Sequence, residues 1–204
     1  MRALELSRPE RVAVGLALAL LVLHALAPGE ALEYQRRLLT HEPWRALTGH
    51  VVHINWPHAV VNAAALWVVA RLYAGDLDSR RQLVALIASA LAISGALAFL
   101  YPSIDWYRGL SGALHGLFFA GATKWLLFER PRTFARLWLP GVLFVGGWIK
   151  VALEQPGGAA TPYAQWLGAA VVPQAHFIGA ICGTVLGALF AATNAGAEQK
   201  RAQQ

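Results

Sequence analysis

The pattern with the clearest capacity for chemistry is a serine flanked by glycines, Gly109-Leu110-Ser111-Gly112, at the head of an apolar segment. Glycine lets a second backbone or a substrate come close. A hydroxyl in the first turn of a helix lies at the positive end of the helix dipole. Such a serine could act as a nucleophile that generates an oxyanion. Because glycine and serine also occur where membrane helices simply pack together, the tetrapeptide alone leaves both readings open.

Four polar residues of the apolar segments stand out, because polar groups are costly there and usually functional. His58 and Asn62 are four residues apart and therefore share a helical face. His115 follows Ser111 at the same spacing, and His176 lies near the start of the last apolar segment. All of them fall toward the same end of their segments, so we expect them at one depth, beneath the outer face of a membrane.

These residues fit acyl transfer by a serine. A serine nucleophile needs a base within hydrogen-bond reach, and His176 is the best candidate for the base of Ser111. Close approach of their two segments would be possible at three glycines, Gly109, Gly112 and Gly179. No Asp or Glu at membrane depth is obviously placed to orient the histidine, so the sequence predicts a Ser–His dyad, not a triad.

The tetrahedral intermediate of such a reaction needs hydrogen-bond donors around its oxyanion. The backbone amides of Ser111 and its neighbour Leu110 could supply two of them. The side chains of His58 and Asn62, expected at the same depth, could supply others. We therefore expect an oxyanion site built from these four residues.

A metal site is the alternative use of the histidines. His50, His53 and His58 could bind a metal together with His176. No carboxylate joins them, however, and the sequence contains no His-Glu-x-x-His motif. We therefore expect neither a metal nor another cofactor.

Lys150 and Glu154 are four residues apart at the outer end of the fifth apolar segment. The simplest interpretation is a local ion pair, and the alternative is a role in positioning or gating the substrate. The segment Phe134–Leu153 and the loop 154–166 would then be the gate that admits water and substrate to Ser111.

The composition identifies the elements that must position these residues. The chain has 204 residues, of which 57% are hydrophobic and 14% charged, whereas soluble domains carry about 25% charged residues. The formal net charge is +6, but the basic residues form short clusters between apolar segments. This pattern indicates a polytopic membrane protein, and we expect no nucleic-acid partner. A single cysteine, Cys182, excludes an internal disulfide framework.

Six apolar segments approach the ~20 residues that a transmembrane helix needs. All should be helices, because unpaired backbone is too costly in lipid, so the predicted fold is all-α. Twelve of the 17 Lys and Arg residues fall on one side, which places both termini in the cytoplasm. The predicted spans are Arg11–Ala27, Pro57–Gly75, Leu83–Leu100, Gly109–Phe128, Phe134–Leu153 and Leu167–Thr193.

The predicted organisation is a single membrane domain over residues 1–204, with a core of about 11–193 and short polar tails at 1–10 and 194–204. The Ala25-Leu26-Ala27 sequence after the first apolar segment could also mark a signal-peptide cleavage site. Because five more spans follow, we favour an uncleaved first helix.

Four motifs in this order resemble those of the rhomboid intramembrane serine proteases, over residues 40–190. The motifs are Trp44-Arg45, His53-x4-His58-x3-Asn62, Gly109-x-Ser111-Gly112 and His176-x2-Gly179-x3-Gly183. The resemblance implies a compact bundle of six transmembrane helices. It implies that Ser111 is the nucleophile, that His176 is the base, and that His58 and Asn62 belong to the oxyanion site. Arg45 and His53 would be structural, holding the first outer loop.

One position departs from the better-known rhomboids. Residue 115 is commonly a tyrosine that stacks on the catalytic histidine, and here it is His115. This side chain could stack in the same way, could hydrogen-bond His176, or could compete as the base. The sequence leaves these three possibilities open.

The run from Leu110 to Gly116, the compact size and Lys150-x3-Glu154-Gln155 resemble the rhombosortase branch of the family. That resemblance implies a bacterial inner-membrane enzyme whose active site opens to the periplasm. Its partners would be the lipid bilayer and a transmembrane protein substrate, a surface protein with a C-terminal Gly-Gly, a transmembrane helix and a basic tail. Oligomeric state stays open.

Two other functions compete with proteolysis. A non-catalytic rhomboid-like protein could bind membrane clients, but such relatives have lost the serine or the histidine, and Ser111 and His176 are both present. A transporter that relays protons through histidines should carry polar residues through the full depth of the membrane. The inner halves of the predicted spans are almost wholly apolar, which argues against it.

Overall fold

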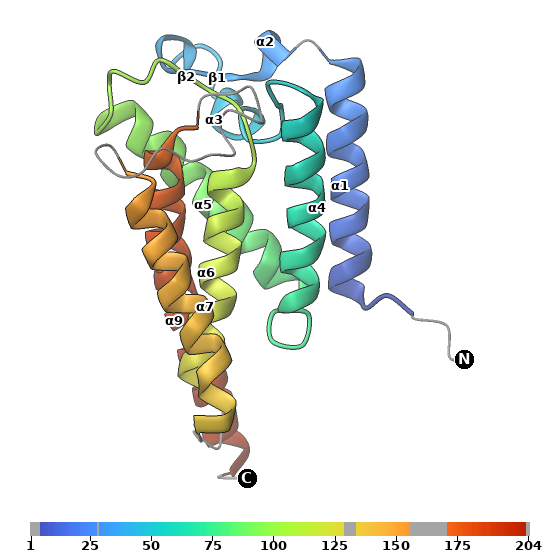
Figure 1. Cartoon of the computed structure of the whole chain (residues 1–204), viewed down its shortest axis with the longest axis vertical. Helices are drawn as coiled ribbons and strands as arrows, with labels where there is room; N and C mark the ends of the chain where they lie inside the picture. Colours follow the sequence, from blue (N-terminus) through green and yellow to red (C-terminus); the bar gives the residue numbers. More distant parts are fainter. Residues whose placement is uncertain (1–4, 28, 129–133, 156–170, 203–204) are drawn as a thin grey trace.

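The computed structural model describes residues 5–27, 29–128, 134–155 and 171–202, and the described chain is mostly helical (Figure 1). Three of its helices are long and apolar enough to cross a membrane. The six long helices are α1 (Arg8–Leu26), α4 (Trp56–Leu72), α5 (Ser79–Phe99), α6 (Ser111–Phe128), α7 (Phe134–Leu153) and α9 (Pro173–Ala202). The three that meet the length and hydropathy of a span are α1, α5 and the Pro173–Thr193 part of α9.

These helices coincide with the predicted apolar segments, and their ends differ by a few residues. Helix α1 begins at Arg8, and α4 ends at Leu72. The predicted start of the sixth span at Leu167 lies outside the described residues, as does most of the loop 154–166. The prediction of a helical membrane bundle is confirmed, whereas six spans and cytoplasmic termini remain predictions.

Local capping fixes where three of the helices begin. Ser7 and Glu10 form a capping box at the start of α1, in which each side chain bonds the backbone of the other. The Asn55 side chain accepts from the His58 amide at the start of α4, and the Asp78 side chain caps α5. The first of these helices is also tied to its neighbour, because Glu10 pairs with Arg71 of α4.

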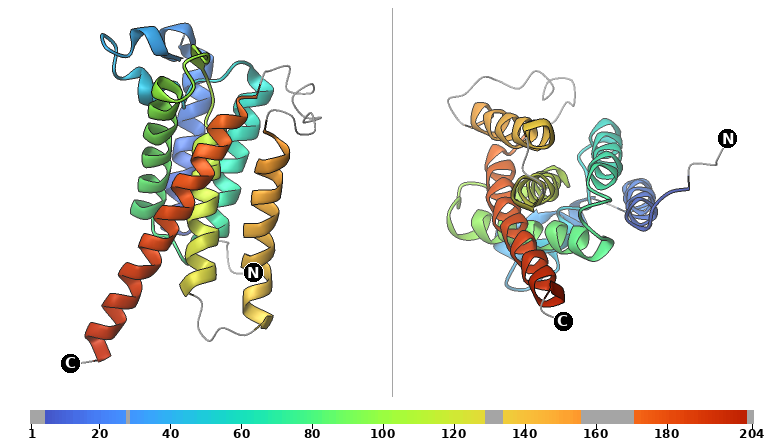
Figure 2. Two further views of the ribbon diagram at one scale, coloured as in Figure 1. Left: turned by 90° about the vertical axis from the view of Figure 1, so that its left-hand side faces the viewer. Right: turned by 90° about the horizontal axis from the view of Figure 1, so that it is seen from below.

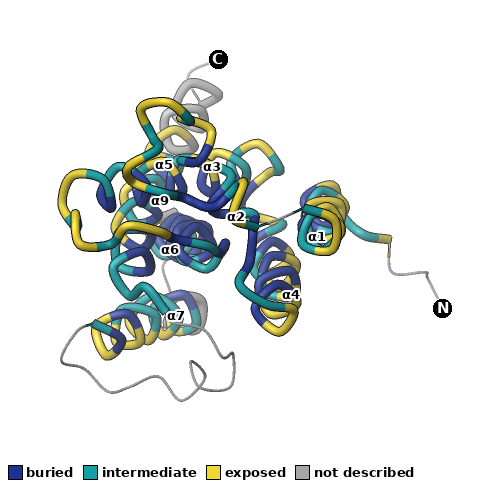
Figure 3. The backbone as a smooth tube through the Cα atoms, turned by 90° about the horizontal axis from the view of Figure 1, so that it is seen from above, coloured by how far each residue is buried: buried dark blue, intermediate teal, exposed yellow. Residues whose placement is uncertain are grey.

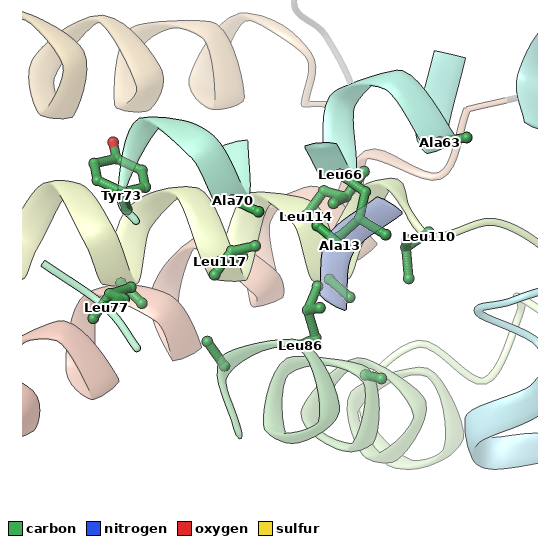
Figure 4. Close-up of a cluster of buried hydrophobic side chains, with 14 of the residues drawn as sticks. Ala13, Ala63, Leu66, Ala70, Tyr73, Leu77, Leu86, Leu110, Leu114 and Leu117 are labelled. Atoms are coloured by element: carbon green, nitrogen blue, oxygen red, sulfur yellow. The ribbon is translucent and has the colours of Figure 1, made fainter. Parts of the chain in front are cut away.

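Helix α6 occupies the centre of the bundle. It contacts α4, α5, α7 and α9, whereas α1 packs outside against α4 (Figure 2). Figure 3 shows most of α6 in the buried colour and exposed residues on the outward sides of α1, α4 and α7. Apolar side chains of α6 meet those of α4 and α5 in the main core, which includes Leu66, Tyr73, Leu86, Leu114 and Leu117 (Figure 4). A helix with apolar residues on most of its sides suits such a central position.

Glycines bring α6 and α9 into backbone contact. An ideal Cβ placed at Gly179 would lie 2.1 Å from the Gly112 carbonyl oxygen, and one at Gly183 would lie 2.1 Å from that of Gly116. Gly187 continues the same stripe against Ala120. The stripe therefore has a structural role, since residues without a Cβ allow two helices to approach so closely.

The segment between α1 and α4 folds over the end of the bundle at which α6 and α9 begin (Figure 1). The Arg45 guanidinium holds this segment together by donating to the backbone carbonyls of Glu30 and Glu33, at 3.0 and 2.8 Å. The short strands β1 (Tyr34–Gln35) and β2 (Trp106–Tyr107) pair antiparallel. The segment also contains α2 (Gly29–Leu32), a 3₁₀ turn (Arg36–Leu38) and α3 (Arg45–Thr48).

The α6–α9 contact yields a test of stability. Gly183→Ala should lower the free energy of unfolding by about 1–3 kcal/mol, because the new methyl group forces the two backbones apart. Gly95→Ala in α5 is the matched control, since a Cβ there has no neighbour within 4 Å. Thermal unfolding in detergent should show a lower midpoint for Gly183→Ala only. Equal midpoints for the two variants would contradict the proposed contact.

Candidate active site

Ser111 is the first residue of α6, and the chain reaches it through an unusual backbone turn. Gly109 has φ of +125°, a conformation that favours glycine. A Cβ at this position would also come within 2.6 Å of the His58 ring. Gly109, two residues before Ser111, is therefore required both by its backbone angle and by the histidine packed against it.

His176 lies in the first turn of α9, where the start of that helix touches the start of α6. A Cβ at Gly112 would approach the Ala175 carbonyl oxygen to 3.0 Å. This close approach places His176 Nε2 2.9 Å from Ser111 Oγ. The structure thus brings the two residues singled out in the sequence into hydrogen-bond contact.

The other ring nitrogen of His176 meets a carboxylate. Glu154, directly after α7, has its Oε2 2.8 Å from His176 Nδ1, and both side chains are buried, with exposures of 3% and 4%. The prediction that no acidic residue is placed to orient His176 is therefore wrong. Ser111, His176 and Glu154 have the geometry of a triad.

Gln155 explains how α7 brings its carboxylate to α9. The Gln155 amide nitrogen donates to the Val151 carbonyl in α7 and to the Pro173 carbonyl at the start of α9, at 3.0 and 3.2 Å. This bridge ties the end of one helix to the start of the other, beside Glu154 and His176. The sequence offered one signal for it, the adjacency of Glu154 and Gln155, but not the direction in which either side chain points.

Lys150 and His115 extend the same network. Lys150 Nζ donates to Glu154 Oε1 at 2.7 Å, so the ion pair considered from their spacing is present. The same ammonium lies 2.9 Å from His115 Nε2. His115 Nδ1 in turn lies 2.8 Å from the backbone carbonyl oxygen of Ser111. The hydrogen bonds therefore form a closed ring, which begins at the Ser111 hydroxyl and ends at the Ser111 carbonyl.

The donors and acceptors of this ring follow from chemistry. An ammonium can only donate, so His115 Nε2 must accept and its Nδ1–H must donate to the Ser111 carbonyl. An ionised carboxylate can only accept, so His176 Nδ1–H donates to Glu154. His176 Nε2 is then left as the acceptor for the Ser111 hydroxyl, which is the tautomer that a general base requires.

His115 stacks on His176, with ring centroids 4.2 Å apart and planes 19° apart. Of the three possibilities left open by the sequence, the structure shows the stack. Competition for the role of base is disfavoured, because the Nε2 lone pair of His115 already accepts from Lys150.

Three of these side chains could also hold a metal ion by their spacing. The donor atoms of His115, Glu154 and His176 lie within 4.8 Å of one another. However, the Lys150 ammonium already donates to two of the three residues and supplies a positive charge at this position. We therefore interpret the group as a hydrogen-bond network.

The predicted oxyanion residues differ in their hydrogen-bond partners. His58 and Asn62 are buried and line the same cavity as Ser111. The Asn62 amide nitrogen donates to the His58 carbonyl at 2.8 Å, which uses one of its two hydrogens. The Leu110 amide, by contrast, donates to His53 Nε2 at 3.4 Å. The Leu110 amide thus already has a partner in His53, and its role as an oxyanion donor stays a prediction.

His53 is well suited to accept that hydrogen bond. It lies in the loop before α4, and burial lowers the pKa of His53 to about 3, with a smaller effect from neighbouring His58 and His24. The ring is therefore neutral at physiological pH and keeps a lone pair for the Leu110 amide. His53 and Arg45 thus contact the connecting segments around the serine, not the serine itself.

A cavity of about 570 Å³ opens beside Ser111 and His176, within the range of ligand-binding pockets. One wall comes from α4 and another from α7, and its surface is mostly apolar. The lining residues from these two helices include Val61, Ala65, Val69, Val142, Leu143 and Gly146. The polar site therefore sits at one end of an apolar chamber between two helices.

The chain is similar to a known protein family. The rhomboid domain matches residues 40–193, which is more than half of the chain and contains every residue of the hydrogen-bonded ring. A comparison with curated proteins gives no match. The family match, which spans the whole glycine-packed core and the site at its end, shows that this chain belongs to the rhomboid family.

Proposed function

We propose that this protein is an intramembrane serine endopeptidase in which Ser111 is the nucleophile and His176 the general base. The observation that carries the proposal is the 2.9 Å contact between Ser111 Oγ and His176 Nε2. The rhomboid family consists generally of intramembrane serine proteases, and the chain is a multi-pass membrane protein by its family and its apolar helices.

The reaction would proceed in two halves. Ser111 Oγ bonds to the scissile carbonyl carbon, its proton passes to His176 Nε2, and the carbonyl electron pair moves onto the oxygen. The imidazolium then gives this proton to the leaving amine as the C–N bond breaks, which leaves an acyl ester on Ser111. Water attacks the ester and gives a proton to His176, which returns it to Ser111 Oγ as the acid product leaves.

Three groups would stabilise the oxyanion. The Ser111 amide lies at the start of α6, where the first backbone N–H groups of a helix have no partner within it. Asn62 keeps its second amide hydrogen beyond the bond to His58, and His58 Nδ1 is buried without a hydrogen-bond partner among the described residues. Buried donors in a mostly apolar chamber act strongly on a developing negative charge.

The apolar chamber supports a transmembrane substrate. Walls from α4 and α7 are suited to a lipid-soluble segment, and the polar site at one end would meet that segment near a membrane boundary. A helix must unwind to expose a peptide bond, and each glycine lowers helix stability by ~1 kcal/mol. Following the resemblance to the rhombosortase branch, with which these features agree, the substrate class we propose is a single-span surface protein with a C-terminal Gly-Gly sequence, cleaved near the periplasmic face of the bacterial inner membrane.

The nucleophile assignment is tested by Ser111→Ala and His176→Ala. Each should reduce cleavage of a single-span Gly-Gly reporter in proteoliposomes by about 10⁴-fold or more, because nucleophile and base act as one unit. Ser103→Ala, which changes an exposed serine in the loop before α6, is the control and should cleave like the wild type. Cleavage that persists in Ser111→Ala would rule out the assignment.

The oxyanion assignment is tested by Asn62→Ala. Loss of one oxyanion donor should lower kcat by about 10²–10³-fold with little change in KM, because the donor acts on the transition state. The same reporter assay measures both constants, and thermal unfolding checks that the variant is folded. A folded variant with wild-type kcat would remove Asn62 from the proposed site.

A further inference from the structure

We propose that Glu154 is a positioning residue of the active site, which acts through His176 and is itself held in place by Lys150. The inference rests on the proposed function, since it concerns the base of that reaction. It turns the Ser–His pair into a Ser–His–Glu triad. It also gives Lys150 and His115 a definite part in the same machinery.

The two oxygens of the Glu154 carboxylate have different partners. Glu154 Oε2 accepts from His176 Nδ1 at 2.8 Å, and Oε1 accepts from Lys150 Nζ at 2.7 Å. One oxygen therefore faces the base and the other faces the cation. A carboxylate that accepts the Nδ1–H of a catalytic histidine fixes its tautomer and stabilises the imidazolium that forms when the serine is deprotonated.

The burial of Glu154 is unlike that of a surface ion pair. An ordinary i, i+4 ion pair on a helix leaves both side chains in solvent. Here the Glu154 side chain is 3% exposed, whereas that of Lys150 is 46% exposed. A carboxylate is costly to bury, and this one is buried on the side of His176. The asymmetry favours a carboxylate placed for the histidine over one placed for the lysine.

The base His176 lies near a positive charge. Lys150 bonds to His115, and the His115 ring stacks on His176, so an ammonium lies close to the place where imidazolium must form. A like charge disfavours a nearby cation. Glu154 bonds both partners and offsets this repulsion. Without the negative charge of Glu154, the Lys150 ammonium would disfavour protonation of His176.

The opposing effects of Glu154 and Lys150 on His176 predict the outcome of a double-variant test. Glu154→Gln keeps the shape of the side chain and removes its charge, so that the Glu154 carboxylate no longer offsets the Lys150 ammonium near His176. Lys150→Met in the Glu154→Gln background should then partly restore activity. A pair that merely stabilises the end of α7 would not behave in this way, because removing its second member could not repair chemistry at Ser111.

The experiment measures covalent labelling of the full-length protein by a fluorophosphonate, which needs no known substrate. Saturation kinetics give the maximal labelling rate and the half-saturating concentration separately. Glu154→Gln should lower the maximal rate by about 10²–10⁴-fold, the range of general-base catalysis, with the half-saturating concentration unchanged. Glu154→Gln/Lys150→Met should label about tenfold faster than Glu154→Gln alone.

Glu33→Gln is the matched control. Glu33 is another largely buried carboxylate in an ion pair, bonded to Arg108 at 2.6 Å, and its side chain contacts neither Ser111 nor His176 in the bonds described. It should lose stability but label at the wild-type rate. A folded Glu154→Gln with the wild-type maximal rate, or a double variant no faster than the single one, would overturn the proposal.

Two further outcomes separate this inference from the function beneath it. If the wild type is not labelled, or Ser111→Ala is labelled equally, the proposed function itself fails and the triad fails with it. If Glu154→Gln does not fold, Glu154→Asp keeps the charge and withdraws it by one methylene. That variant should label more slowly than wild type at an unchanged half-saturating concentration, and an unchanged rate would contradict the role of Glu154.

Discussion

The backbone contact between α6 and α9 is the constraint on which the site depends. Gly112 and Gly116 on one helix face Gly179 and Gly183 on the other, at a separation that leaves no room for a Cβ. Ser111 lies directly before these contacting glycines and His176 lies just before Gly179. The backbone contact therefore sets the distance between the hydroxyl and the imidazole. A shift of about 1 Å in such a contact is enough to cost a reaction 10²-fold.

The hydrogen-bonded ring beside this contact stabilises the charges of the buried site. A base buried among apolar helices must accept a proton with little help from water, and an unpaired buried charge is costly. Glu154 and Lys150 form a buried anion and a partly exposed cation that each bond to a histidine. The ring satisfies its members and orients His176, and the exposed side of Lys150 connects the network to solvent.

The sequence predicted the helices and the main pair of residues because these depend on local patterns. Apolar runs predicted α1, α4, α5, α6, α7 and α9, and matched depth predicted that Ser111 and His176 lie together. The role of Glu154 could not be read in the same way, since it depends on how α7 is rotated and on the Gln155 bridge to Pro173. The bond of the Leu110 amide to His53 could not be predicted either, because it joins loops that are distant in the sequence.

The central claim is that the α6–α9 contact activates Ser111 as a nucleophile. Mass spectrometry of the fluorophosphonate-treated protein tests it most directly, because peptide mapping locates the phosphonyl group on a single residue. The account predicts an adduct on Ser111 in the wild type and a strongly reduced adduct in His176→Ala. An adduct on another serine, or equal modification of Ser111 without His176, would contradict it.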